Sequence, residues 1–241
     1  MAELLSLTTL IVCSLAIMII VRFFGRYGLY MYSVVAVIVS NLQVLKLTKY
    51  GFWDSPVALG TIVFSTTFAV DNILNEYFGG QAAKKGVWIS FSGYLLFAIL
   101  MKITALHPEI PPSECVNMHA EMSRLFSPVF NLFAASLLSY LIGQFADIFV
   151  FSKLKAKLKG KYVSFRSMIS MGLSTFIDNC LFSLLTWVVF AEHSLNLYSL
   201  WTTYICATYI MRLMVAALCV PLVKLAGMFI LEEKNNNVRY I

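Results

Sequence analysis

Three aspartates and one arginine lie inside long apolar stretches of the chain, at Asp71, Asp147, Asp178 and Arg212. An ionised side chain in the middle of a membrane costs at least about 2.5 kcal/mol unless it faces protein or water. Such residues mark places where a polar solute or an ion is handled, or ion pairs that join helices. Both interpretations stay open for Arg212, which can pair with an aspartate. They stay open for Asp147 as well, which lies near the end of its stretch and can reach water there.

Polar residues recur every three or four positions around each of these charged residues, which places them on one face of a helix. The stripes are Thr67, Asp71 and Asn75, with Asn72 and Glu76 beside them; Tyr140, Gln144 and Asp147; Ser170, Ser174 and Asp178, with Asn179 beside them; and Thr208 and Arg212. The other faces are apolar, so the stripes are predicted to turn inward and line a shared cavity.

A cavity of this composition suits a planar polar solute. A carboxylate can accept two hydrogen bonds from a guanine-like edge, which offers a ring N–H and an exocyclic amine. Aromatic residues make up 15% of the chain and supply rings for stacking. These properties alone admit many other polar solutes.

The elements that must position these residues are membrane helices. Of the 241 residues, 60% are hydrophobic and 12% are charged, against about 45–50% and about 25% in soluble domains. Several apolar runs reach about 20 residues, the length that crosses a bilayer as helix. The predicted spans are about 4–21, 28–47, 57–78, 86–106, 127–151, 168–191 and 199–224. The five cysteines show no metal or disulfide spacing, and Arg22 follows the first run where a signal peptide would have a cleavage site.

The basic residues predict the orientation of the seven spans. With the N-terminus outside and the C-terminus inside, 13 of the 18 Lys and Arg lie inside and four lie outside. The inner ones are Arg22, Arg26, Lys84, Lys85, Lys153, Lys155, Lys157, Lys159, Lys161, Arg166, Lys224, Lys234 and Arg239, and the outer ones are Lys46, Lys49, Lys102 and Arg124. This bias follows the positive-inside rule and favours a bacterial inner membrane. Spans 57–78 and 168–191 would then run in opposite directions, and the lysines of 153–161 indicate topology and anionic lipid rather than nucleic acid.

Several blocks together resemble the signature of the queuosine precursor transporter family. They are Asp71–Gly79 followed by Ala82–Lys85 and Val87–Phe91, then Tyr140–Phe151 before a basic loop, then Ser174–Phe182, with Ser40-Asn41 upstream. The resemblance covers roughly residues 35–225, in the family's order and spacing.

This resemblance implies uptake of 7-deazaguanine precursors of queuosine across the bacterial inner membrane. It implies an all-α fold, a polytopic bundle whose six-helix core at 28–226 is similar to substrate-binding subunits of vitamin transporters. Residues 1–26 would add one N-terminal helix, within a single membrane domain at 1–241. No cofactor, metal or catalytic residue is expected. The expected substrate-binding residues are Asn41, Asp71, Asn72, Asn75, Glu76, Gln144, Asp147, Ser174, Asp178, Asn179 and Arg212.

The chain departs from the family pattern at three positions. The acidic residue of the first block usually stands where this chain has Asn72, and here the carboxylate is one step earlier at Asp71. Near the third block, Thr175 replaces a frequent glutamine and Asn179 a frequent threonine. One step along a helix turns a side chain by about 100°. The choice between Asp71 and Asn72 as the ligand, and the choice among the nitrile base, the aminomethyl base and queuine, therefore stay open.

Parts of the sequence are also compatible with functions other than uptake of a queuosine precursor. A vitamin-like or nucleobase solute would suit the same polar stripes, and so would a binding subunit served by a separate energising complex. The sequence has no P-loop, so it is not expected to hydrolyse a nucleotide. An intramembrane protease or lipid transferase would need carboxylates paired for acid–base chemistry, and the HExxH motif is absent. A scaffold would not need the polar stripes.

Overall fold

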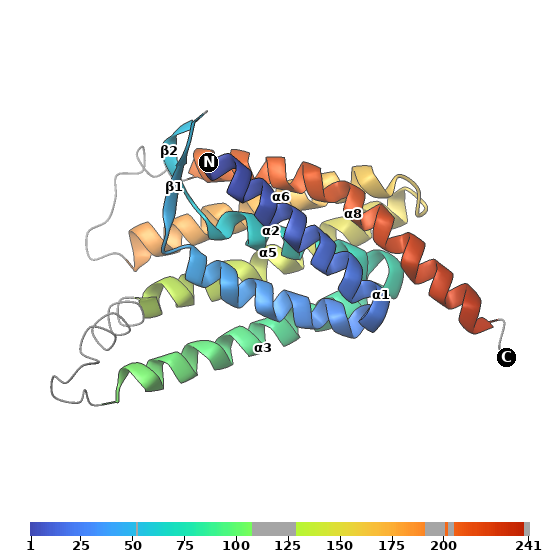
Figure 1. The fold of residues 1–241 in the computed structure, drawn as a ribbon, viewed down its shortest axis with the longest axis horizontal. Helices are drawn as coiled ribbons and strands as arrows, with labels where there is room; N and C mark the ends of the chain where they lie inside the picture. The colour runs from blue at the N-terminus through green and yellow to red at the C-terminus, as the bar shows by residue number, and fades with distance from the viewer. Residues whose placement is uncertain (52, 108–128, 191–200, 202–204, 239–241) are drawn as a thin grey trace.

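Long helices lie side by side in a bundle in the computed structural model, which describes residues 1–51, 53–107, 129–190, 201 and 205–238 (Figure 1). In chain order the elements are α1 (Ala2–Gln43), β1 (Leu47–Tyr50), β2 (Trp53–Ala58), α2 (Gly60–Ile73), the π-helical turn η1 (Leu74–Phe78), α3 (Gly80–Ala105), α5 (Val129–Lys157), α6 (Val163–Leu184), the π-helical turn η2 (Leu185–Val189) and α8 (Ala207–Val238). The predicted helical bundle is confirmed. The predicted loop at 107–126 and its Arg124 lie outside the described residues from 108 on.

Helix α1 runs along the bundle twice. It breaks at Gly25, whose φ of 53° and ψ of −136° are not helical, and glycine adopts a positive φ at little cost. Val12 on the first limb and Val35 on the second line the same groove, so the two limbs lie against each other. They correspond to the predicted spans 4–21 and 28–47, although the second limb ends at Gln43.

A short β-hairpin follows α1, where the sequence predicted no strand. Strands β1 and β2 pair antiparallel, with Leu47 opposite Ala58 and Tyr50 opposite Trp53. Thr48, Tyr50 and Val57 are residue types that favour strands. The hairpin is fixed to the start of α1, because the Tyr50 and Ser6 hydroxyl oxygens lie 2.8 Å apart in a hydrogen bond.

Five helical stretches in the described part of the chain are long and apolar enough to cross a membrane. They are Ala2–Gln43, Gly80–Ala105, Phe133–Lys157, Val163–Val189 and Thr208–Ile230. The two limbs of α1 count once among them, and α2, with 14 residues, falls short of the length. The chain is therefore a polytopic helical membrane protein, while seven crossings remain a prediction.

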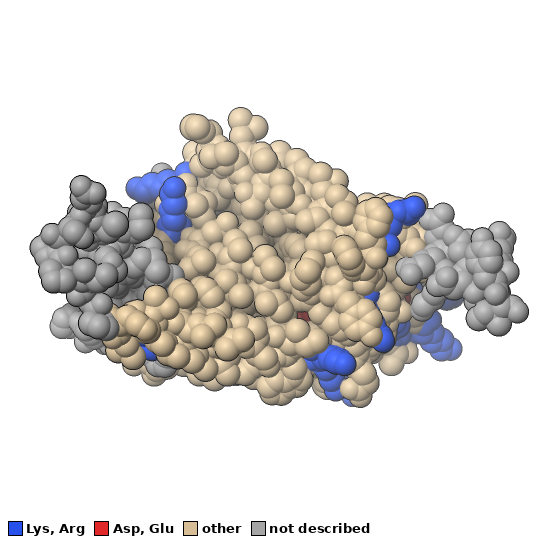
Figure 2. Space-filling view, turned by 60° about the horizontal axis from the view of Figure 1, so that its bottom comes forward, with Lys and Arg blue, Asp and Glu red and all other residues tan. Residues whose placement is uncertain are grey.

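The ends of the bundle differ in charge. The segments predicted to lie inside, namely the turn of α1 at Gly25, the η1–α3 and α5–α6 junctions and the end of α8, all lie at one end, here called the basic end (Figure 1). The N-terminus and the β-hairpin lie at the opposite end, called the hairpin end. Figure 2 shows Lys and Arg gathered toward the two ends, with a broad band of almost only uncharged side chains between them on that face. Such a band fits the hydrocarbon layer of a bilayer.

Helix α2 forms the centre of the bundle. Every residue from Gly60 to Ile73 is buried, and α2 packs against α1, α5, α6 and α8. Its polar side chains can therefore meet other polar side chains instead of lipid, as the stripe on 57–78 predicted. Helices α2 and α6 run in opposite directions. Asn72 near the end of α2 bonds to Ser170, and Glu76 in the following turn η1 bonds to Arg166, which lies further back on α6.

Candidate functional site

The predicted site residues lie at three successive levels between α2, α5 and α6. The recess level, near the hairpin end, holds Asn41, Asp178 and Arg212; the middle level holds Asp71, Gln144, Asp147 and Ser174; the basic-end level holds Asn72, Asn75 and Glu76. Asn179 lies apart from all three, since its amide donates to the backbone carbonyl of Ile205 at 2.8 Å. Along α2 the recess residue Phe64 precedes Asp71 by seven residues, or about 10 Å of helix.

The recess level is a pocket enclosed by five helices. Its walls are Ser40 and Asn41 of α1 with Val44 just after it, Gly60, Thr61 and Phe64 of α2, Ser136 and Ser139 of α5, Asp178 and Phe182 of α6, and Arg212 of α8. The Arg212 guanidinium forms an ion pair with Oδ2 of Asp178 and lies 5.0 Å over the Phe64 ring. Asp178 Oδ1 and Arg212 Nε are buried and have no hydrogen-bond partner among the described residues. One acceptor and one donor are thus left free beside each other.

The recess is narrow. It contains about 360 Å³ of free space when its open mouth is counted, of which about 30 Å³ can take the centre of a water molecule. That smaller volume accommodates about two water molecules. A ring-sized solute therefore requires the walls of the recess to move apart.

Close packing of α5 against α6 fixes the position of Asp178. A Cβ atom placed on Gly143 would lie 2.8 Å from Cβ of Asp178, which is closer than packed carbon atoms approach. Small residues let membrane helices come this near. Gly143 therefore allows the Asp178 carboxylate to lie where Arg212 can reach it.

The middle level joins α2, α5 and α6. Gln144 Nε2 donates to Oγ1 of Thr67 at 2.6 Å, and the Ser174 hydroxyl donates to Oδ1 of Asp147 at 3.0 Å. The position of Asp147 near the end of a predicted span allowed its carboxylate to reach water. In the structure the side chain is instead fully buried. The second carboxylate oxygens of Asp71 and Asp147 and the amide oxygen of Gln144 have no partner in the described part of the chain.

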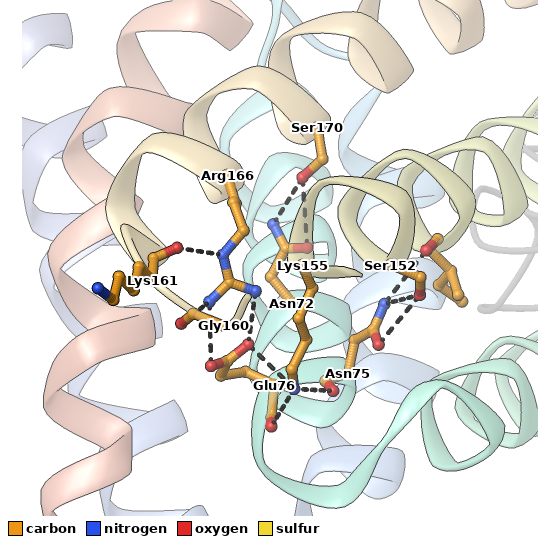
Figure 3. A network of polar contacts seen from close by, with 10 residues as sticks. Asn72, Asn75, Glu76, Ser152, Lys155, Gly160, Lys161, Arg166 and Ser170 are labelled. Atoms are coloured by element: carbon orange, nitrogen blue, oxygen red, sulfur yellow. Dashed lines mark hydrogen bonds and ion pairs between the residues drawn. The ribbon is translucent and has the colours of Figure 1, made fainter. Parts of the chain in front are cut away.

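The basic-end level is a dense polar network (Figure 3). The Arg166 guanidinium donates to both carboxylate oxygens of Glu76, at 3.0 and 3.1 Å, and to the backbone carbonyls of Lys161 and Gly160, both at 3.0 Å. Lys155 forms a second ion pair with Glu76 at 3.2 Å. The network ties η1, the end of α5 and the start of α6 together.

The two asparagines of this level are also bonded across helices (Figure 3). The Asn75 amide nitrogen lies 2.9 Å from the Ser152 hydroxyl oxygen and donates to it. The Asn72 amide donates to the Ser170 hydroxyl at 3.2 Å. The sequence left open whether Asp71 or Asn72 is the ligand. In the structure Asn72 is bonded to α6, whereas Asp71 keeps one carboxylate oxygen without a partner among the described residues.

Arg166 and Lys155 were missed as site residues, because the sequence assigned both to an inner loop. Arg166 is fully buried in α6, which begins at Val163, five residues before the predicted span at 168. A signal was present, since Arg166 precedes Ser170 by four residues and so continues its stripe. Lys155 belongs to α5, which extends to Lys157, beyond the predicted end at 151.

With this geometry in view, the chain was compared with known proteins. Residues 58–226, well over half of the chain, match the family described as "Putative vitamin uptake transporter". The chain belongs to this vitamin uptake transporter family. The match runs from the end of β2 into α8, so it includes every predicted site residue at the three levels except Asn41 of α1.

One curated relative of this vitamin uptake transporter carries a more specific name. The protein is 25% identical to the "Probable queuosine precursor transporter" of Bacillus subtilis (strain 168) over 201 residues, which is 82% of each chain. No solved structure matches. Membership of the family and this relative agree with the resemblance found in the sequence.

Proposed function

We propose that this chain carries a 7-deazaguanine precursor of queuosine inward across the bacterial inner membrane, and that the recess is its binding site. The family is one of uptake transporters, and the Bacillus subtilis relative is named for a queuosine precursor. Of the signature blocks, Ser40, Asn41, Asp178 and Phe182 line the recess.

The unpaired atoms of the recess carry this proposal. Native proteins leave few buried polar atoms without a partner, and each one asks for an explanation. Asp178 Oδ1 is an acceptor and Arg212 Nε is a donor. A 7-deazaguanine base has the complementary edge, with ring and amine N–H groups for the carboxylate and a carbonyl oxygen for the guanidinium. Binding of the base would therefore satisfy both atoms.

Two aromatic side chains of the recess suit a planar ring. Phe64 and Phe182 come from α2 and α6, so they line the recess from different helices. A ring inserted between them gains stacking contacts, worth about 0.5–1.5 kcal/mol beyond the area buried. Because the recess is narrow, insertion separates these helices, and this movement would link binding to the opening and closing that transport requires.

The proposed topology has seven crossings, with the hairpin end outside and the basic end inside. The two limbs of α1 and the α2–η1 segment supply the crossings beyond those that length and composition select. Residues 28–226 would form the transporting core and 1–26 an added helix against lipid. The partners of this unit are the membrane and a small-molecule solute. A direct nucleic-acid contact is not part of the proposal.

An uptake experiment tests the proposal. Cells that cannot make queuosine should regain modified transfer RNA when they express this chain and are given the nitrile base, the aminomethyl base or queuine. Asp178→Asn should lower uptake at least about tenfold, because a hydrogen bond to a charged group is worth about 1.5–3 kcal/mol. Leu173→Ala, on the exposed face of the same helix, is the matched control and should transport normally.

Two outcomes would contradict the proposal. Normal membrane expression without uptake of any of the three bases would assign the family's transport to another vitamin-like or nucleobase solute. Uptake that is equal in Asp178→Asn and Leu173→Ala would remove the recess from the path of the base. Where uptake is found, competition among the three bases ranks them as substrates.

A further inference from the structure

The middle level contains three buried acceptor oxygens without a donor. They are Oδ2 of Asp71, Oε1 of Gln144 and Oδ2 of Asp147, and their side chains are at most 2% exposed. A buried polar group without a hydrogen bond costs on the order of the bond itself, and a buried charge costs far more. Three such atoms at one level indicate a missing partner that carries positive charge.

These oxygens belong to one cluster. The Gln144 amide is held 2.6 Å from Thr67, and Thr67 lies one helical turn before Asp71 on the same face of α2. Gln144 and Asp147 are three residues apart on α5 and so share a face as well. The Asp71 and Asp147 carboxyl groups interact electrostatically across the space between α2 and α5. Gln144 is thus held against Thr67, on the faces of α2 and α5 that carry the two carboxyl groups.

The cations of the bundle are committed elsewhere. Arg212 pairs with Asp178 at the recess, and Arg166 and Lys155 pair with Glu76 at the basic end. No ion pair between described residues involves Asp71 or Asp147. Among the described residues, the other titratable groups that interact with Asp71 are tyrosines, Tyr30 of α1 and Tyr140 of α5, which carry no positive charge. Helix α6 contributes the Ser174 hydroxyl.

We propose that Asp71, Gln144 and Asp147 form a binding site for a monovalent cation, a proton or Na⁺, that moves together with the substrate. Two carboxyl groups and an amide oxygen supply acceptors only, which excludes an anion and suits either ion. The site lies between the recess and the network at the basic end, so a cation entering from the hairpin end meets the recess first. Cotransport rests on the proposed function, whereas the site itself rests only on these contacts.

Uptake by the purified protein in liposomes tests the coupling. The probe is the labelled nitrile base, which has no ammonium group of its own to fill the site. Wild type should take it up at least threefold faster under an inward proton gradient or an inward Na⁺ gradient than without either. Asp71→Asn and Asp147→Asn should lose this stimulation and still exchange labelled for unlabelled base. Glu3→Gln removes a carboxylate at the hairpin end and should behave as wild type.

The outcomes separate the two proposals. Stimulation by protons alone identifies the proton as the cation, and stimulation by Na⁺ alone identifies Na⁺. If neither gradient changes the rate of base uptake by wild type, the cluster is not a coupling site for a cation. The same follows if a gradient still stimulates uptake in both aspartate variants. Failure of wild type to transport the base under any gradient contradicts the proposed function instead.

A second measurement tests the site without any substrate. The melting midpoint of the purified protein in detergent should shift by several degrees between pH 5.5 and 8, or on replacing choline with Na⁺. The double variant Asp71→Asn/Asp147→Asn, which keeps the side-chain shapes, should lose this shift, and Glu3→Gln should keep it. An equal shift in the double variant and wild type would overturn the site.

Discussion

The basic-end network differs from the recess and the middle level in how its polar side chains are paired, although all three contain similar residue types. At the basic end Glu76, Lys155 and Arg166 are all paired with opposite charge, and Asn75 is bonded across helices. In the recess and the middle level, Asp178 keeps one carboxylate oxygen without a hydrogen bond, and the described residues supply no cation to Asp71. Satisfied groups fix helices together, whereas unsatisfied ones are available to a ligand.

Under the proposed function, this difference would give the two regions separate roles in transport. Arg166 connects η1 to the carbonyls of the α5–α6 loop, so an ion pair and hydrogen bonds join these segments at the basic end (Figure 3). The recess near the hairpin end has room for water. A cycle that releases solute at the basic end must therefore break the pairing of Glu76.

The largest expected effect comes from breaking the basic-end network on one side. Arg166→Gln leaves the largely buried Glu76 carboxylate, 12% exposed, with only Lys155. Removing one member of a buried pair costs about 3–5 kcal/mol. The melting midpoint of the purified protein should fall strongly in Arg166→Gln. The double variant Glu76→Gln/Arg166→Gln should recover part of the loss, because no buried charge is then unpaired. A double variant less stable than the single one would show that the pair does not act as a unit.

A medium effect is expected for a substitution on α5 beside the recess. Gly143→Ala adds a methyl group 2.8 Å from Cβ of Asp178, and overpacking of this kind costs about 1–3 kcal/mol. Because the added methyl group pushes on Asp178, the loss of uptake should be larger than the loss of stability alone would cause. Gly172→Ala is the control on α6, since a Cβ there meets its nearest atom at an ordinary 3.5 Å. Equal uptake in the two variants would contradict the close approach.

The smallest effect is expected for a neutral bond of the network. Asn72→Ala removes the hydrogen bond to Ser170, and such a bond contributes about 1 kcal/mol. Stability should fall slightly and uptake should remain within about twofold of wild type. The comparison with Asp71→Asn, one residue earlier, distinguishes the two neighbours directly. A loss of uptake in Asn72→Ala larger than in Asp71→Asn would make Asn72 the ligand.

Much of the fold follows from periodicity in the sequence. The apolar runs predicted the helices, and spacing of four residues placed Asp71 and Asp178 on inward faces, where both are buried. The opposite directions of α2 and α6 followed from alternation of the charged ends. The hairpin at 47–58 was not predicted, because its four- and six-residue strands lie at the junction of two predicted helices and form only by pairing.

The three levels of the site could not be predicted from the sequence. A polar stripe shows which face of a helix a side chain lies on, but it does not show which residue of another helix that side chain contacts. Arg212 could have paired with more than one aspartate, and the fold decides for Asp178. Arg166 escaped notice since its charge indicated a loop, although its spacing continued the α6 stripe. A membrane interior accepts such an arginine only with a partner, and Glu76 lies on another helix, 90 residues away in sequence.

The most direct test of the contrast between the two regions is equilibrium binding of a labelled 7-deazaguanine base to purified protein. Wild type and Asn72→Ala should bind it with dissociation constants within about twofold of each other, because the basic-end network is already satisfied. Asp178→Asn, measured well below its own melting midpoint, should bind at least about tenfold more weakly. Binding that is unchanged in Asp178→Asn, or lost in Asn72→Ala, would contradict the assignment of the base to the recess.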